Sequence, residues 1–312
     1  MLVEVDATTF EQYFNNDIHP FISKAFVELN KAKVEKIVRL VEDTNKPEIG
    51  LLAGVSSNEL LSPFSAPFGG FHFKKENIYS EKIDAFMLSL KEYIYINNFT
   101  EFRTTLPPDI YHQTFNAKCI NSLNRAGFLN KTPEITSWID LSSIADNYTQ
   151  KNSREYYRQA QRNHLVFEQT FSESDKADAY QLISENRAKF GRPIYMTLDD
   201  LKQMEELWPV DYFKVTTTEQ EMLASAIFYR WSNNIAYAVF WGDNEQGRSL
   251  RAMDYLILNL WHFYKNKKYR YVDLGISTED GVPNSGLLRF KETHEAVSSV
   301  RYRFVLKQKE ES

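Results

Sequence analysis

The stretch of residues 285–304, SGLLRFKETHEAVSSVRYRF, carries the most information on the fold and the chemistry of this chain. Its first half predicts a short helix that ends in the cluster Arg289-Phe290-Lys291, and residues 297–303 predict a strand in which every second side chain is Val, Ser or Arg. An arginine and a lysine just before a late strand are placed to fix an anionic substrate group at the end of a sheet. We therefore expect the chemistry near this cluster.

The composition is that of a folded chain with more than one core. Its 312 residues correspond to about two domains of ~150 residues, and a hydrophobic share of 43% supplies sizeable cores. Cys119 is the single cysteine, so an intrachain disulfide and a cysteine-rich metal site are excluded, and its thiol is more typical of core filling than of a nucleophile. None of the six histidines has zinc-type spacing, so we expect no metal. His294 alone lies near the cluster, as a candidate proton carrier.

The formal net charge of -5 excludes a globally basic nucleic-acid binder, so we expect no DNA partner. The N-terminus has acidic residues where a signal peptide carries positive charge, and no run of ~18 apolar residues occurs. These features predict a cytoplasmic protein without a membrane span.

The first half of the chain predicts a hairpin followed by alternating helices and strands. Residues 36–41 and 50–55 predict its two strands, and the turn composition of residues 43–47 separates them. Residues 60–73 contain two prolines and a glycine pair, which predicts an edge strand that leaves through a loop. The remaining predictions are a helix over 80–97 with a buried stripe at Ile83, Phe86, Met87, Leu90 and Ile94, a strand over 99–106, a helix over 117–125 that ends at Gly127, and a strand over 135–141.

The second half repeats this order of elements. Residues 212–218, 222–231 and 235–241 predict three antiparallel strands, with Asn233-Asn234 as the turn between the last two. The other predictions are a strand over 165–171, a helix over 174–190, a helix that begins near Thr197, a helix over 250–264 and a strand over 269–274. The repeat concerns the pattern of elements and not the sequence itself.

Residues 140–163, DLSSIADNYTQKNSREYYRQAQRN, join the two halves. Lys151, Arg154, Arg158 and Arg162 are spaced three or four apart, which predicts a cationic stripe along one helix face. Such a stripe either lines a groove for an anionic acceptor or is a solvated face.

Two of these segments carry a family resemblance. The RFK cluster after a glycine-containing turn and before the final strand resembles the C-terminal signature of FemAB-type peptidoglycan aminoacyltransferases, and the Asp-Leu-Ser of the join, followed by a basic helix, is similar to the start of that family's second domain. Where the family usually continues into a Gly-Phe-Gly-Gly run, residues 292–296 read ETHEA.

The resemblance implies a fold, because FemAB proteins are built from two GNAT acyltransferase folds in tandem. The expected class is α/β (α+β), with GNAT-like domains at residues 1–145 and 146–312, each a mixed, mostly antiparallel sheet flanked by helices. We expect a cleft between these domains to bind the acceptor.

The loop after the third strand of the second half indicates whether the acyl donor is bound through coenzyme A. Coenzyme A-dependent GNATs usually carry two spaced glycines there, whereas residues 243–252 offer only Gly247, preceded by two acids. The loop therefore lacks part of the usual coenzyme A motif, although Arg248 and Arg251 at a helix start can still hold another phosphate.

Lys291 is the candidate catalytic residue, because the resemblance places it beside the acyl-transfer site, where a cation stabilises a developing oxyanion. The alternative is an ordinary solvated lysine. Arg289 is a candidate substrate contact, although helical periodicity turns it away from Lys291.

Further candidates for substrate binding are Arg154 and Arg158 on the join helix, Arg192 and Tyr195 in a loop between two helices, Arg251, and Asp273 at a strand end. The loop is equally consistent with a plain helix connection, and Asp273 with a cap on the following turn.

By resemblance, the chain is an N-acyltransferase or aminoacyltransferase that uses no permanently bound cofactor. The donor is an acyl-CoA or an aminoacyl-tRNA, so tRNA is a candidate partner, and the acceptor is a small molecule or a peptidoglycan precursor. The alternative is a noncatalytic ligand-binding or assembly module on a degenerate GNAT scaffold.

Overall fold

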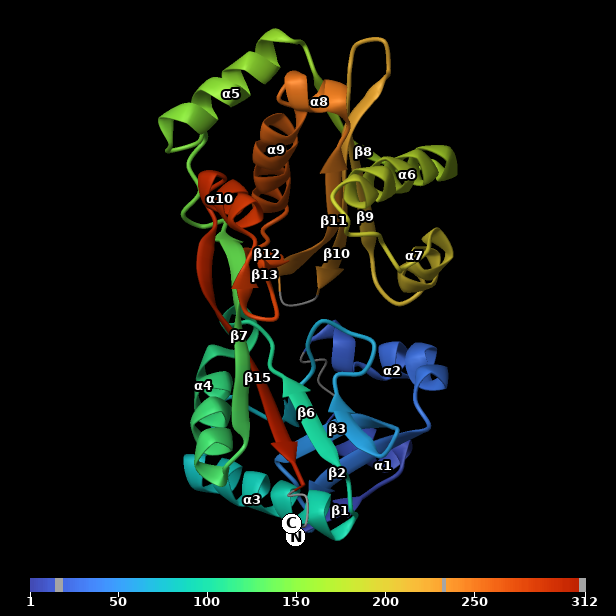
Figure 1. Cartoon of the computed structure of the whole chain (residues 1–312), viewed down its shortest axis with the longest axis vertical. Coiled ribbons are helices and arrows are strands. Elements are labelled where there is room, and N and C mark those ends of the chain that lie inside the picture. Colours follow the sequence, from blue (N-terminus) through green and yellow to red (C-terminus); the bar gives the residue numbers. More distant parts are fainter. Residues whose placement is uncertain (15–18, 232–233, 309–312) are drawn as a thin grey trace. The chain divides into compact units, whose positions relative to one another are not determined.

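The computed structural model describes residues 1–14, 19–231 and 234–308, and Figure 1 labels their helices and strands. The chain packs into two compact units. Unit 1 comprises Met1–Ile135, Thr278–Val282 and Ser299–Ser312, and unit 2 comprises Thr136–Ser277 and Pro283–Ser298. Strands β7 (Leu129–Asp140) and β15 (Val297–Lys307) each contribute residues to both units. The domain boundary at residue 145 stays a prediction.

The sheet of unit 1 contains β1 (Leu2–Glu4), β2 (Lys36–Glu42), β3 (Ile49–Ser56), β4 (Glu59–Ser62), β6 (Glu101–Thr105) and the end of β15, in that order, with β5 (Phe71–Phe73) paired to β3. The hairpin predicted for residues 36–41 and 50–55 is confirmed, since β2 and β3 pair antiparallel with Val38 opposite Ala53. β4 and β6 are parallel, and the other neighbours are antiparallel.

The edge strand predicted within residues 60–73 is confirmed for β5, which pairs with β3 alone among the described strands, and is wrong for β4. β4 lies inside the sheet, because it pairs with β3 on one side and with β6 on the other. Pro63 follows the last residue of β4, Ser62. The missing N–H of the proline therefore removes no hydrogen bond between β4 and its neighbours. The prolines and glycines instead form the connection between β4 and β5.

Alternating side chains of β2 and β3 build a core on each face of this sheet. Leu40 and Leu51 belong to the larger core, whereas the next residues along, Val41 and Leu52, pack with Phe10 on the opposite face. The elements of unit 1 outside the sheet are α1 (Ala7–Tyr13), η1 (Pro20–Ile22), α2 (Lys24–Asn30), η2 (Lys31–Lys33), α3 (Ser80–Ile96) and α4 (Asp109–Ala126).

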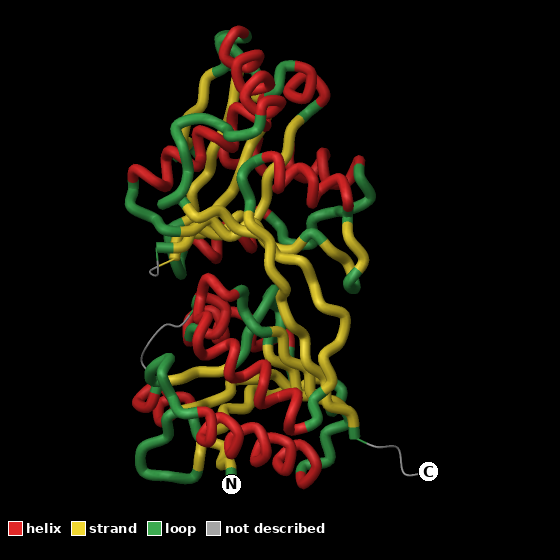
Figure 2. Tube along the Cα trace, turned by 90° about the vertical axis from the view of Figure 1, so that its left-hand side faces the viewer, coloured by secondary structure: helices red, strands yellow, loops and turns green. Residues whose placement is uncertain are grey.

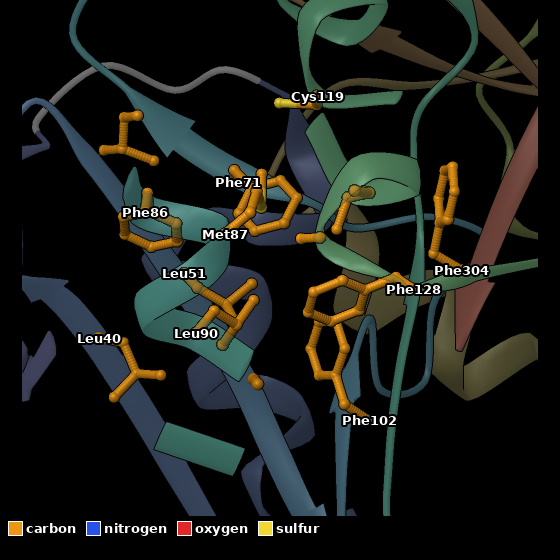
Figure 3. Packing of buried hydrophobic residues seen from close by; sticks show 14 of the residues in the cluster. Leu40, Leu51, Phe71, Phe86, Met87, Leu90, Phe102, Cys119, Phe128 and Phe304 are labelled. Atoms are coloured by element: carbon orange, nitrogen blue, oxygen red, sulfur yellow. The ribbon is translucent and has the colours of Figure 1, made fainter. Parts of the chain in front are cut away.

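The stripe predicted for residues 80–97 is confirmed, because all five of its apolar side chains are buried in α3. Figure 3 shows Met87 and Leu90 beside Phe71 and Leu51 in the larger core. Cys119 is fully buried in the same core, as predicted. α4 is longer than the predicted helix and ends as predicted, at Gly127 with φ of 90°.

The sheet of unit 2 has the order β7, β12 (Tyr271–Ile276), β11 (Ile235–Asp243), β10 (Met222–Trp231), β9 (Val210–Thr216) and β8 (Val166–Thr170). The three antiparallel strands predicted in this half are confirmed as β9, β10 and β11. Asn233 of the predicted turn lies outside the described residues. β11 and β12 are parallel and pair only from Ile235 opposite Tyr271 to Tyr237 opposite Asp273, so the two strands part while β11 continues.

Helices cover both faces of this second sheet (Figures 1 and 2). α6 (Glu173–Lys189) packs against β10 and β11, and α9 (Ala252–Asn266) packs against the same strands and against α5 (Lys151–Arg162). The helix predicted near Thr197 is confirmed as α7 (Leu198–Glu205), which Thr197 and Asp200 cap reciprocally. α8 (Glu245–Ser249) and α10 (Ser285–Thr293) complete the helices that border the site.

Candidate active site

A cleft of about 920 Å³ lies in unit 2 and is lined by side chains from five helices and one strand. Its walls come from the start of α5, the end of α6, the last residues of β11, the turn through α8 into α9, and α10. All of its lining residues belong to unit 2.

The cleft lies where the parallel pair of strands separates. Trp241 and Asp243, which line it, lie beyond Tyr237, the last residue of β11 that pairs with β12. Phe290 of α10 packs edge-on against Trp241 with ring centroids 6.0 Å apart. The separated end of β11, the first turn of α9 and α10 therefore border the same cleft. We call α10 the RFK helix, because it contains Arg289-Phe290-Lys291.

Five arginines give the cleft its charge: Arg187, Arg192, Arg248, Arg251 and Arg289. Two of these lie over aromatic rings of the same wall, since the guanidinium of Arg251 is 3.9 Å from the ring centre of Tyr156 and that of Arg248 is 5.4 Å from Phe190. A flat guanidinium stacked on a ring keeps its N–H groups in its own plane, where they can meet an anion edge-on. This arrangement suits phosphate or carboxylate ligands.

The arginines also influence one another. Burial, and then the charge of Arg192, lower the pKa of Arg187 below its usual value. Its guanidinium lies 5.7 Å from the ring centre of Phe240. Like charges gathered in this way favour an anionic occupant, because an anion removes their mutual repulsion.

Two carboxylates line the same cleft and have different partners. Asp243 accepts a hydrogen bond from Arg248 at 3.2 Å and one from the amide of Asn186 at 3.0 Å, while burial raises its pKa. Asp254, in the first turn of α9, lies 3.3 Å from the ring nitrogen Nε2 of His294. The cleft thus combines cations with one carboxylate–imidazole pair.

Three of the residues proposed from the sequence as substrate contacts come together in this cleft, namely Arg192, Arg251 and Arg289. The others lie elsewhere. Arg154 donates to the carbonyl oxygen of Tyr148 at 3.1 Å, and the exposed Arg158 pairs with Glu155 at 3.7 Å.

Tyr195 is 91% exposed and does not line the cleft. Lys291 and Asp273 are both buried, each with 1% of its surface exposed. The ammonium of Lys291 donates to the carbonyl oxygens of Gly275 at 2.8 Å and Ile276 at 2.9 Å, so it is not a solvated lysine. Asp273 accepts from the backbone N–H of Gly275 at 2.8 Å and caps the turn after β12.

Three lining residues, Arg187, Trp241 and Asp254, escape prediction from the sequence. Each belongs to an ordinary helix or strand pattern, and no motif marks it. The acidic first turn of α9, which contains Asp254, is the one local signal, and acids are common there for reasons of helix stability. Among the described residues, no group of three or more His, Cys, Asp or Glu side chains is arranged to hold a metal ion.

The part of the chain that the structure describes contains no helix with the length and apolar character needed to cross a bilayer. No family model matches the sequence, and a search of curated proteins finds no match either.

Solved structures do match. FemX superimposes with a TM-score of 0.66 at 12% identity, covering 99% of this chain and 97% of FemX. A tandem GNAT protein from the clavulanic acid biosynthesis pathway gives 0.57 at 12% identity, covering 100% and 99%. The C-terminal domain of a putative lysylphosphatidylglycerol synthetase from Agrobacterium fabrum gives 0.58 at 12% identity, covering 97% and 93%.

These likenesses establish the fold. The chain has a FemAB-like tandem GNAT fold of the α/β class, in which mostly antiparallel sheets are flanked by helices, as the sequence predicts.

Proposed function

We propose that this chain is an N-acyltransferase or aminoacyltransferase that transfers an acyl or aminoacyl group to an amine acceptor in the cleft of unit 2. The observation that carries the proposal is the position of the cleft, at the point where β11 parts from β12 and against the RFK helix. A parted strand leaves backbone N–H groups without ladder partners, and such groups polarise a carbonyl.

The five arginines support an anionic substrate. Acyl-CoA and aminoacyl-tRNA, the two candidate donors, both carry phosphates, and a peptidoglycan precursor carries phosphates and carboxylates. One of the similar structures belongs to a putative lysylphosphatidylglycerol synthetase, so a phospholipid headgroup is a further candidate acceptor. Arg192, Arg248, Arg251 and Arg289 are the contacts that the proposal assigns to the anion.

Lys291 remains the candidate for stabilising the charge of the transition state. Its ammonium lies at the end of β12, beyond the point where β11 and β12 separate, and is buried in protein. A buried cation acts over a longer distance than an exposed one because less water screens it. Arg154, Arg158 and Tyr195 have no part in the cleft as we propose it.

The experiment is a thermal-shift screen followed by a transfer assay. Purified protein is melted with coenzyme A, acetyl-CoA, UDP-linked muropeptides and charged tRNA. A true ligand raises the melting temperature by mass action, since it adds about 2.7 kcal/mol of stability at a hundred times its Kd. The stabilising donor is then incubated with amine acceptors, and the product is followed by mass spectrometry. Transfer of the group supports the proposal.

Binding without transfer supports the second candidate, a noncatalytic ligand-binding module. One observation favours that candidate: Gly247 is packed so that a Cβ atom there would lie 2.2 Å from the carbonyl oxygen of Leu223. The glycine is thereby explained by packing alone, without a bound pyrophosphate.

A further inference from the structure

His294 and Asp254 form a carboxylate–imidazole pair in the wall of the cleft. Acyl transfer to an amine needs a group that accepts the proton of the amine, and such a pair can accept one. Their side chains have 4% and 13% of their surface exposed, and both residues line the cleft. His294 caps the C-terminal end of α10, three residues after Lys291. Asp254 belongs to α9.

The hydrogen-bond partners of His294 fix where its proton lies. The ring nitrogen Nδ1 is 2.6 Å from the carbonyl oxygen of Phe290, which has no hydrogen, so Nδ1–H must donate. Nε2 then faces Oδ1 of Asp254 at 3.3 Å, and among the described residues it has no hydrogen-bond partner. Without a further proton two acceptors face each other, and with one they become an imidazolium and a carboxylate.

The surroundings hold this geometry. The ring of Tyr148 meets the ring of His294 edge-on with centroids 5.3 Å apart, and its hydroxyl donates to the backbone carbonyl of Asp254 at 2.8 Å. Trp261 donates to the backbone carbonyl of His294 at 3.2 Å. Both aromatic side chains are almost fully buried, so packed side chains hold the pair in position.

The other titratable groups near the pair are accounted for. Burial, and then the charge of Asp254, raise the pKa of the Tyr148 phenol, which therefore stays neutral. Glu295 accepts hydrogen bonds from Thr149, and Lys291 donates to backbone carbonyls. Asp243, the other carboxylate in the cleft, forms an ion pair with Arg248, whereas Asp254 faces Nε2 of His294.

We propose that Asp254 and His294 are the proton acceptor of the transfer reaction, an inference that rests on the proposed function. The amine nitrogen attacks the carbonyl carbon of the donor, the new C–N bond forms, and the C–O or C–S bond to the leaving group breaks. The proton that the amine loses passes to Asp254 at the cleft and is held between Asp254 and His294, and the leaving oxygen or sulfur takes a proton from solvent. Asp254 is the residue that meets the amine, and His294 is the positioning residue behind it.

Two variants test the pair in the full chain with the donor and acceptor found by the screen. Asp254→Asn keeps the shape and removes the carboxylate, and we expect kcat to fall about 100-fold or more with a smaller change in KM. The acid-side fall of the pH–rate profile should vanish, because the group whose protonation causes it has been disabled. His294→Gln should lower kcat less and should alter the same limb of the profile.

Glu76→Gln is the matched control. Glu76 pairs with His112 at 3.2 Å in unit 1, so the substitution breaks a second carboxylate–imidazole pair of the same protein, and neither residue lines the cleft. It should leave rate and pH profile unchanged. If Asp254→Asn behaves like this control, the pair is not the proton acceptor, although the transferase proposal survives. If the wild-type protein transfers nothing to any acceptor, both proposals fall together.

A measurement without substrate tests the geometry by itself. Nitrogen-15 NMR of the histidine rings should show His294 with a proton on Nδ1 in the wild-type protein and a changed Nε2 resonance in Asp254→Asn. A neutral ring protonated on Nε2 alone would contradict the pairing, whatever the activity. Circular dichroism of both variants confirms that they are folded.

Discussion

The ammonium nitrogen of Lys291 lies 2.8 Å from the carbonyl oxygen of Gly275. A second hydrogen bond, to Ile276 at 2.9 Å, makes the lysine a clamp between α10 and the end of β12. The residue that the RFK resemblance places at the reaction therefore also holds the strand whose departure from β11 opens the cleft.

These two hydrogen bonds predict that Lys291 contributes to stability as well as to activity. Lys291→Met keeps most of the buried stem but leaves two carbonyl groups without their donor, so we expect a loss of about 1–3 kcal/mol in the free energy of unfolding. Transfer should fall much further than this loss explains. Urea titration gives the first quantity and initial rates give the second. Full transfer activity in the folded variant would remove Lys291 from the mechanism.

Arg251 should control affinity for the anionic ligand. Arg251→Gln removes the guanidinium that stacks 3.9 Å above Tyr156, and loss of a charge-assisted contact of about 1.5–3 kcal/mol weakens binding about 10- to 100-fold. Calorimetry with the ligand found by the screen measures the change. Arg158→Gln, on an exposed arginine of the same unit, is the control and should bind normally. Equal affinities in the two variants would place the ligand elsewhere.

Gly247 should not tolerate a side chain. A Cβ atom at this position would lie 2.2 Å from the backbone oxygen of Leu223, so Gly247→Ala must displace α8 from β10. Overpacking of this kind costs about 1–3 kcal/mol. We expect a lower melting temperature together with weaker ligand binding, since Arg248 is carried by the same helix. For the melting temperature alone, Gly286→Ala is a suitable comparison, because its new Cβ would be 3.5 Å from the nearest atom.

Unit 1 should lose stability in mild acid because of two buried histidines. Burial lowers the pKa of His19 to about 3 and that of His72 to about 4, against ordinary values near 6.5. Between these limits the unfolded chain binds more protons than the folded one. Stability is thus complete above about pH 6.5 and falls as pH decreases toward 4, by about 1.4 kcal/mol per pH unit for each histidine. Urea titrations from about pH 7.5 to 4.5 test this, and a flat profile would contradict it.

Local patterns are enough to predict most of the helices and strands. The apolar stripe of α3 is predicted correctly because the spacing of Ile83, Phe86, Met87 and Leu90 is a property of the chain itself. The same holds for the strands β9 to β11 and for the cap at Gly127. The error at β4 comes from Pro63, whose place just after the strand only hydrogen-bond pairing reveals.

Local sequence patterns do not predict which residues come together in the candidate site. The sequence by itself determined that cationic residues cluster near the last helix, and with the FemAB resemblance it predicted a tandem GNAT fold. The tertiary structure decided which arginines share a cleft, that Lys291 is buried, and that His294, just after α10, meets Asp254 of α9. Helical and strand periodicity is set by neighbours along the chain, whereas burial and ion pairing depend on which segments the packing of the core brings together.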